Sequence, residues 1–198
     1  MYPGTLVQLI ENFRKLPGVG EKTAERYALS VCDMNETDVL EFAEALKNVK
    51  EKLKYCPVCG NLTDTEICTI CSDPDRNKKE IFVVQSAKDV LAIERTAQFR
   101  GVYHVLNGLI SAAKGIMPEN LNIDTLIERA KDADEIILAT NTTMDGETTA
   151  MYLDKLLQEQ YPDLLITRIA RGMPSGGLLD YADEMTLAHA LSDRKRLK

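Results

Sequence analysis

Four cysteines, arranged as two pairs, constrain the fold of this chain more than any other feature of its sequence. Cys56 and Cys59 form one C-x-x-C pair, and Cys68 and Cys71 form a second pair after eight intervening residues. Two pairs at this spacing place four thiolates tetrahedrally around one Zn²⁺, and Gly60 permits the tight turn after the first pair. Because all four ligands come from the protein, no position remains for substrate or water, and we expect one structural zinc ion per chain. An iron–sulfur cluster is the less favoured alternative.

The composition narrows the class of protein. The 198 residues, 44% of them hydrophobic, suffice for a sizeable core and one or two domains. No run approaches the ~18 apolar residues that span a bilayer, and the first residues lack the pattern of a signal peptide. We therefore expect a cytoplasmic protein without membrane contact. Cys32 has no partner cysteine pair, and we expect it to be a small, partly buried residue. The net charge of -7 argues against a general nucleic-acid binder, so a DNA contact requires a local basic patch.

The chain divides into four predicted segments. Residues 1–54 have the apolar spacing of three helices, the third capped by Thr37 or Asp38. Residues 55–79 hold the cysteines, residues 80–170 alternate strands with helices, and residues 171–198 close the chain. Apolar strands are expected at 81–85, 102–106, 135–140 and 164–170. Their alternation with helices predicts right-handed βαβ units, hence a multi-domain α/β protein with a mostly parallel four-stranded sheet flanked by helices.

A glycine-rich turn joins the first two predicted helices. Gly18 and Gly20 let the backbone turn sharply and expose amide groups at the start of the second helix, a geometry that binds phosphate. Lys22 and Arg26 lie four residues apart and share the adjacent helix face. This pattern resembles the helix–hairpin–helix of DNA-binding and repair proteins. A plain packing unit of two helices remains the alternative, because Gly-x-Gly alone is a weak signal.

The sheet segment lacks the carboxylates of a metal-dependent active site. Its strand and helix order resembles the Toprim fold of topoisomerases, primases and some nucleases, in which carboxylates hold Mg²⁺. The corresponding positions here are Gln85, Asn141 and Thr143. Neutral oxygens offset the dehydration and charge of Mg²⁺ poorly, so we expect no two-metal catalysis. Asp145 and Glu147 are present but lie outside the usual ligand positions.

Other candidate sites are weaker. His104 falls in a predicted strand and His189 in a predicted helix, without an evident nucleophile or carboxylate partner, so we expect both to be structural. The glycine-rich loop at 171–177 follows the last strand, where ligands often bind, but a demanding turn is an equal explanation. The sequence has no phosphate-binding G-x-x-x-x-G-K-[ST] pattern.

Four motifs together resemble the RecR family of bacterial recombination mediators over essentially the whole chain. They are LPGVGEKTAERYAL, CPVCGN with the second C-x-x-C, ATN-x-T-x-x-GE-x-TA-x-Y and RIARG-x-P-x-GG. The resemblance implies a non-catalytic protein of DNA recombination and DNA-damage repair, located at the nucleoid. It implies ring-shaped homotetramers that encircle double- or single-stranded DNA and act with RecO and RecF to load RecA onto strands coated by SSB.

The resemblance also assigns residues. Gly18, Gly20, Lys22 and Arg26 fall at the DNA-binding positions of the family. Asp145 and Glu147 fall where the family meets RecO, and the closing segment resembles its Walker-B-like tail, which joins subunits. Many relatives carry Glu at the position of Gln85, and Pro and Glu at those of Thr142 and Asp145. Two other functions stay open, a Mg²⁺-dependent Toprim nuclease or primase and a scaffold that binds protein alone.

Overall fold

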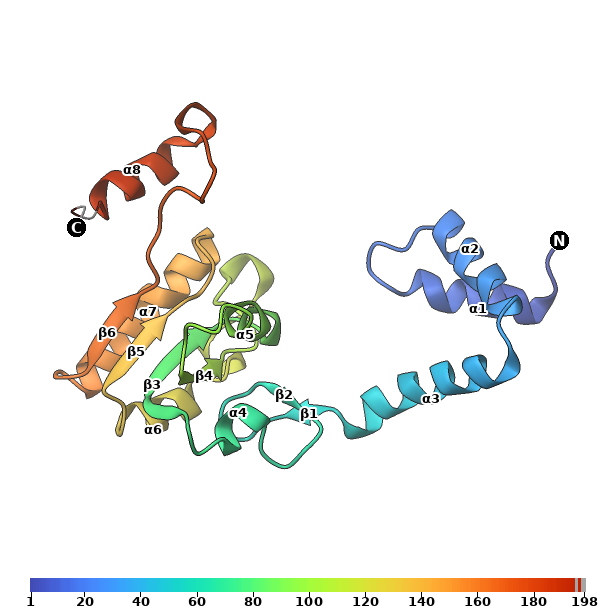
Figure 1. The fold of residues 1–198 in the computed structure, drawn as a ribbon, viewed down its shortest axis with the longest axis horizontal. Helices are drawn as coiled ribbons and strands as arrows, with labels where there is room; N and C mark the ends of the chain where they lie inside the picture. Colours follow the sequence, from blue (N-terminus) through green and yellow to red (C-terminus); the bar gives the residue numbers. More distant parts are fainter. Residues whose placement is uncertain (195, 197–198) are drawn as a thin grey trace. The chain divides into compact units, whose positions relative to one another are not determined.

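The computed structural model describes residues 1–194 and 196 (Figure 1). The chain divides into two compact units, Met1–Leu53 and Lys54–Lys198. Predictions that concern residues 195, 197 and 198, at the end of the closing segment, lie outside the described residues. Within the described part, no helix is long and apolar enough to cross a membrane.

The first unit consists of three helices. These are α1 (Gly4–Arg14), α2 (Glu21–Cys32) and α3 (Glu36–Lys52). A small core forms where α1 meets α2, and it buries Ile10, Ala24 and Ala28. The two alanines sit one helical turn apart, so their short side chains let the two helices approach closely.

Two expectations for this unit are wrong. The cap of α3 is Asn35, whose side-chain oxygen accepts a hydrogen bond from the Asp38 amide at 2.9 Å. Asn35 is a strong N-cap residue, and it starts the helix earlier than the predicted caps Thr37 and Asp38 would. Cys32 is exposed and not partly buried. It lies at the end of α2, beyond the contact with α1 that buries Ala24 and Ala28.

The second unit begins with the cysteine-bearing segment. Strands β1 (Lys54–Tyr55) and β2 (Leu62–Thr63) pair antiparallel and form a hairpin, and the short helix α4 (Thr69–Ser72) follows. We call residues 54–72 the knuckle. The hairpin carries the first cysteine pair, while α4 carries Cys71 and begins directly after Cys68.

A four-stranded parallel sheet forms the body of this unit, which confirms the predicted α/β class. Its spatial order is β4-β3-β5-β6. The strands are β3 (Asn77–Val84), β4 (Gly101–Val105), β5 (Glu135–Leu138) and β6 (Leu165–Arg168). Strand β3 begins at Asn77, before the predicted residue 81, because Asn77 already pairs with Gly101 of β4 and Glu80 pairs with Glu135 of β5.

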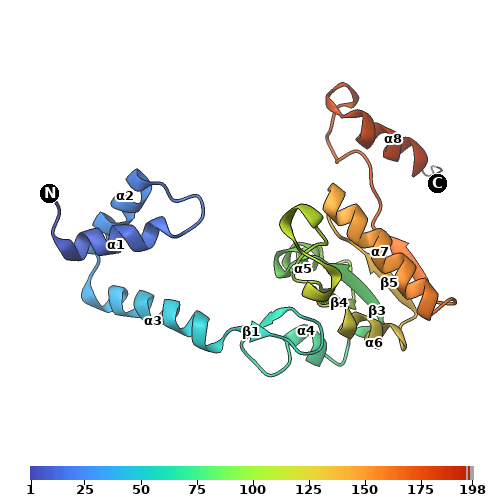
Figure 2. The ribbon, with the colours of Figure 1, turned by 180° about the vertical axis from the view of Figure 1, so that it is seen from behind.

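Helices cover both faces of the sheet. Helices α6 (Asp124–Ala130) and α7 (Met144–Gln160) pack with Ile81, Val83 and Ile136 on one face, and Figure 2 shows α7 lying along β5 and β6. Helix α5 (Ala87–Glu94) packs with Phe82 and Val84 on the other face. Alternate residues of β3 thus enter different cores, as the two-residue period of a strand requires. Past β6 the chain continues to the short turn Leu179–Tyr181 and to α8 (Glu184–Ser192).

Candidate metal centre and nucleic-acid interface

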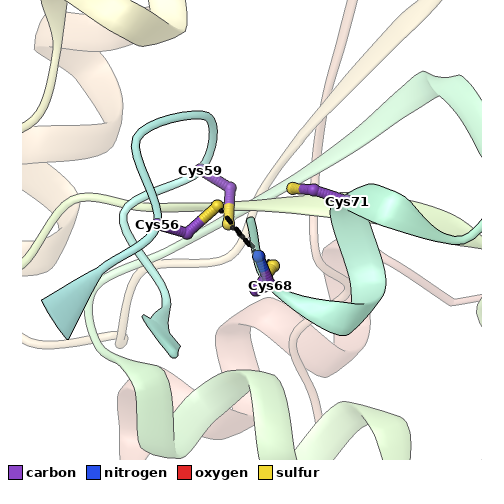
Figure 3. A group of neighbouring side chains, drawn as sticks. All are labelled: Cys56, Cys59, Cys68 and Cys71. Atoms are coloured by element: carbon purple, nitrogen blue, oxygen red, sulfur yellow. Dashed lines mark hydrogen bonds between the residues drawn. The ribbon is translucent and has the colours of Figure 1, made fainter. Parts of the chain in front are cut away.

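The four cysteines of the knuckle converge on one point. Their sulfur atoms all lie within 4.8 Å of one another, and Figure 3 shows the four side chains pointing toward a common centre. Cys56, Cys59 and Cys68 are buried, and Cys71 is less so. Among the residues described, this is the one group of three or more Cys, His, Asp or Glu side chains close enough to hold a metal ion.

Local backbone geometry builds this site. The Gly60 amide donates to the Cys56 carbonyl at 2.8 Å, and the Cys56 amide donates to the Asn61 carbonyl at 2.7 Å, which closes the turn of the first pair. Gly60 has a φ of 73°, a conformation that glycine adopts without strain. In the second pair, the Ser72 amide donates to the Cys68 carbonyl at 3.0 Å, and the resulting turn of helix carries Cys71.

The thiols have unequal affinities for protons. Burial opposes ionisation of Cys56, but hydrogen bonds from the backbone amides of Cys68, Cys59 and Val58 outweigh it and lower the pKa of Cys56 to about 7. A hydrogen bond with Cys71, followed by burial, raises the pKa of Cys59. Burial raises the pKa of Cys68 to about 11. A soft divalent cation such as Zn²⁺ displaces these protons and satisfies all four sulfurs at once, so the donor set fits a closed zinc site.

The knuckle is attached to the edge strand of the sheet. The Val105 amide, at the end of β4, donates to the Cys59 carbonyl at 2.7 Å. The Asn107 side chain donates to the Gly60 carbonyl at 3.1 Å. A β-carbon at Gly60 would approach the Val105 carbonyl to 2.6 Å, so the backbone contact requires glycine there. The sequence did not predict this attachment.

The predicted DNA-binding residues cluster at the turn between α1 and α2. Gly18 has a φ of 79°, and no other group lies within 4 Å of where a β-carbon would project from Gly18 or Gly20. The first turn of α2 has no side-chain cap, so its amides face open space beside Gly20. Lys22 and Arg26 are both exposed on this helix.

The two cations are free of carboxylate partners within the described part of the chain, where ion pairs involve other lysines and arginines. The Arg26 guanidinium lies 5.6 Å from the centre of the Tyr27 ring, a distance typical of a cation–π contact. Exposed amides and two unpaired cations on one helix make a surface that can receive the phosphates of a nucleic acid.

The carboxyl edge of the sheet holds the positions of the Toprim carboxylates. Gln85 and Asp145 line one pocket of about 480 Å³ there, together with Lys114. The Gln85 side-chain oxygen is buried and has no hydrogen-bond partner among the described residues. The Asp145 carboxylate lies 3.7 Å from the Lys114 ammonium. Thr143 caps α7 by accepting from the Gly146 amide at 3.3 Å. These groups do not form a carboxylate cluster.

Glu147 has a different environment from Asp145. Its carboxylate accepts from Arg168 at 2.8 Å and from Arg171 at 3.3 Å. Residues two apart on a helix point in different directions, so the first turn of α7 separates the two carboxylates that the sequence groups together. Asp145 lies at the pocket beside Gln85, whereas the charge of Glu147 is already compensated by two arginines.

His104 and Arg129 form a partly buried polar pair next to the knuckle, which residue spacing did not predict. His104 is fully buried in β4, and its Nε2–H donates to the Asn122 carbonyl at 2.6 Å. Burial lowers the pKa of His104 to about 4, so the ring is neutral and its Nδ1 accepts from Arg129 at 3.2 Å. Arg129 also donates to the Tyr103 carbonyl at 2.7 Å. Burial lowers the pKa of Arg129, while negative charge on Cys71 and the other three cysteines opposes this shift.

Four family models match the chain in order along the sequence. A RecR helix-hairpin-helix model matches residues 6–50, and a RecR model of a zinc finger domain with four cysteines matches residues 53–73. A Toprim domain model matches residues 79–170, and a RecR C-terminal model matches residues 172–195. The family resemblance inferred from the sequence motifs is thereby confirmed.

Proposed function

We propose, from the premise that this chain belongs to the RecR family, that it is a non-catalytic DNA-binding mediator of recombination in DNA repair. The observation that carries this proposal is the hairpin turn with its exposed amides and two unpaired cations, Lys22 and Arg26. Contacts of this kind hold a phosphodiester backbone without reading its bases. A mediator that must act on many sequences requires such binding.

The proposed mode of action is a ring. A single copy offers two cations on a chain of net charge -7, and two phosphate contacts bind weakly at physiological salt. Several copies closed around one DNA molecule raise the effective concentration of each hairpin. We therefore propose a homotetrameric clamp on double- or single-stranded DNA, which with RecO and RecF loads RecA onto strands coated by SSB. One zinc ion in each chain holds the knuckle.

For the partner surface, we propose Asp145 as the principal contact of RecO and Glu147 as an auxiliary one. Asp145 forms one ion pair, with the exposed Lys114, and its own side chain is partly exposed, so its charge stays available to a basic partner. Glu147 would have to exchange its two arginines for the partner, which offsets part of the gain. In this proposal Asp145 serves the protein partner, and the hairpin cations Lys22 and Arg26 serve DNA.

The DNA-binding proposal is tested by the double variant Lys22→Ala/Arg26→Ala. We expect it to weaken binding to labelled DNA strongly at equal salt, and the slope of log affinity against log salt to fall by about 1 for each cation in each hairpin that touches DNA. The readout is fluorescence anisotropy over a series of salt concentrations, with circular dichroism to verify the fold.

The matched control is Lys50→Ala/Lys52→Ala, which removes the same charge from α3 of the same unit. It should leave the salt slope close to that of the wild type. Equal loss in both double variants would mean that net charge and not the hairpin governs binding. Unchanged affinity in Lys22→Ala/Arg26→Ala would exclude the hairpin as the DNA-binding surface.

A further inference from the structure

Arg129 places a positive charge beside the cysteine site. It lies in the last turn of α6 and lines a pocket of about 220 Å³ together with Cys71 and Val58 of the knuckle. One guanidinium nitrogen is held by the Tyr103 carbonyl at 2.7 Å and by His104 Nδ1 at 3.2 Å. Both acceptors are uncharged, so neither compensates the charge of the guanidinium.

Arg76, a second arginine that contacts β4, differs from Arg129 in that a carboxylate compensates its charge. Arg76 donates to the Gly101 carbonyl of β4 at 3.1 Å, much as Arg129 donates to Tyr103. Arg76, however, also forms a bidentate ion pair with Glu94, at 2.5 and 2.9 Å. Within the described residues no carboxylate pairs with Arg129. A partly buried cation without a counter-charge is costly.

A zinc ion held by the four cysteines would supply the missing charge. One divalent zinc ion with four thiolates carries two net negative charges, and three of the four cysteines are buried away from water. That anion requires compensation for the same reason that Arg129 does. Arg129 and the ligand Cys71 line one pocket, which Lys78 and Asp132 also line.

We propose that Arg129 is the counter-cation of the zinc tetrathiolate, so that its charge strengthens zinc retention and joins the knuckle to α6 and β4. His104 acts as a positioning residue, because its Nε2–H is committed to the Asn122 carbonyl and its Nδ1 is therefore free to hold the guanidinium. Outer groups of this kind tune a metal site without touching the metal. The inference depends on zinc in the knuckle and is independent of DNA binding.

The first test measures zinc affinity of the full chain by competition with a chromophoric chelator. Arg129→Gln removes the charge and keeps a hydrogen-bond donor, and we expect about 10- to 100-fold weaker zinc binding. Arg129→Lys keeps the charge and should retain most of the affinity. Arg76→Gln, which disturbs the other end of β4, is the matched control and should leave zinc affinity close to that of the wild type.

The second test separates charge from packing. A lost packing contact destabilises the zinc-loaded and zinc-free proteins alike, whereas a lost counter-charge destabilises mainly the loaded form. We expect Arg129→Gln to lower the urea midpoint more with zinc than without it, and Arg76→Gln to lower both equally. Equal losses for Arg129→Gln in the two forms, or equally weak zinc binding in Arg129→Gln and Arg129→Lys, would overturn the proposal.

A third variant keeps the proposal testable if Arg129→Gln does not fold. Asp132 is exposed at the rim of the same pocket, so its replacement leaves the core intact. Asp132→Asn removes a negative charge near the zinc site and should raise zinc affinity, an effect that added salt weakens. Unchanged or lower affinity in Asp132→Asn would contradict electrostatic control of the site from this pocket.

Discussion

Two regions of the second unit are candidates for holding a metal, and they differ in how their ligands are brought together. In the knuckle, four cysteines of one chemical kind converge within 4.8 Å. At the carboxyl edge of the sheet, the positions that hold carboxylates in Toprim enzymes carry an amide, a second amide and a hydroxyl. The first set supplies all four ligands of a soft cation, whereas neutral oxygens offset the dehydration of a hard cation poorly.

The comparison shows that the two regions depend on a metal ion to different degrees. The knuckle needs its ion, because residues 54–72 bury little besides the cysteines themselves. The sheet needs none, because helices on both faces already cover its apolar strands. The carboxyl edge holds a pocket with one carboxylate, that of Asp145, which is partly exposed.

The largest expected effect comes from breaking the knuckle. Cys59→Ser replaces a buried sulfur ligand by a poor one, so we expect loss of the zinc ion and a loss of more than about 4 kcal/mol from the free energy of unfolding of the zinc-saturated protein. The Val105 amide should also exchange faster, because its acceptor is the Cys59 carbonyl. Metal content, urea unfolding and hydrogen exchange measure these changes.

Cys32→Ser is the control for this experiment, since Cys32 is exposed and lies outside the second unit. It should leave metal content and stability unchanged. Full zinc occupancy in Cys59→Ser would contradict the contrast between the two regions, because the knuckle would then not require all four of its cysteine ligands.

An intermediate effect on the free energy of unfolding is expected from pH, through the buried His104. The folded pKa of His104 is about 4, below the ordinary value of about 6.5, so the unfolded chain takes up a proton that the folded chain refuses. The contribution to stability is complete above about pH 6.5 and is lost as the pH falls toward 4, by up to about 3 kcal/mol.

The variant His104→Gln isolates this contribution, because both proteins lose thiolate ligands to acid in the same way. We expect the stability of His104→Gln, measured by urea unfolding from pH 7 to pH 4, to fall less steeply than that of the wild type. Parallel curves would show that the acid sensitivity belongs to the cysteines alone, and His104 would then have no part in it.

The smallest expected effect comes from restoring carboxylates at the carboxyl edge of the sheet. The triple variant Gln85→Glu/Asn141→Asp/Thr143→Asp returns carboxylates to the sheet edge, and aspartate still caps α7 well. We expect weak Mn²⁺ binding with a Kd of about 1 mM. At about 10 mM Mn²⁺ this should raise the free energy of unfolding by about 1.4 kcal/mol.

The same three positions changed to alanine are the control, and they should show no response to Mn²⁺. The wild type should likewise show no response and should neither cleave nor extend labelled DNA with Mg²⁺ or Mn²⁺. Turnover in the wild type that disappears in Asp145→Asn would favour the enzymatic alternative and remove the basis of the contrast.

Several features were predictable because each depends on residues close together in the chain. The C-x-x-C spacing predicts the convergent sulfurs, and the glycines of the first unit predict a turn that leaves α2 open at its start. The alternation of apolar strands with helices predicts the parallel sheet. Errors occurred at the ends of elements, where Asn35 competes with nearby capping residues and where Cys32 falls outside the helix contact.

The sequence by itself determined the ligand set of the knuckle, the hairpin turn and the βαβ order, because short covalent separations restrict which conformations bring these residues together. Only the tertiary structure decided that Arg129 lies beside the cysteines, that His104 is buried against it, and that Asp145 and Glu147 have different neighbours. These contacts join segments that are far apart in the chain. They depend on how the helices and strands pack, and residue spacing along the sequence does not predict that packing.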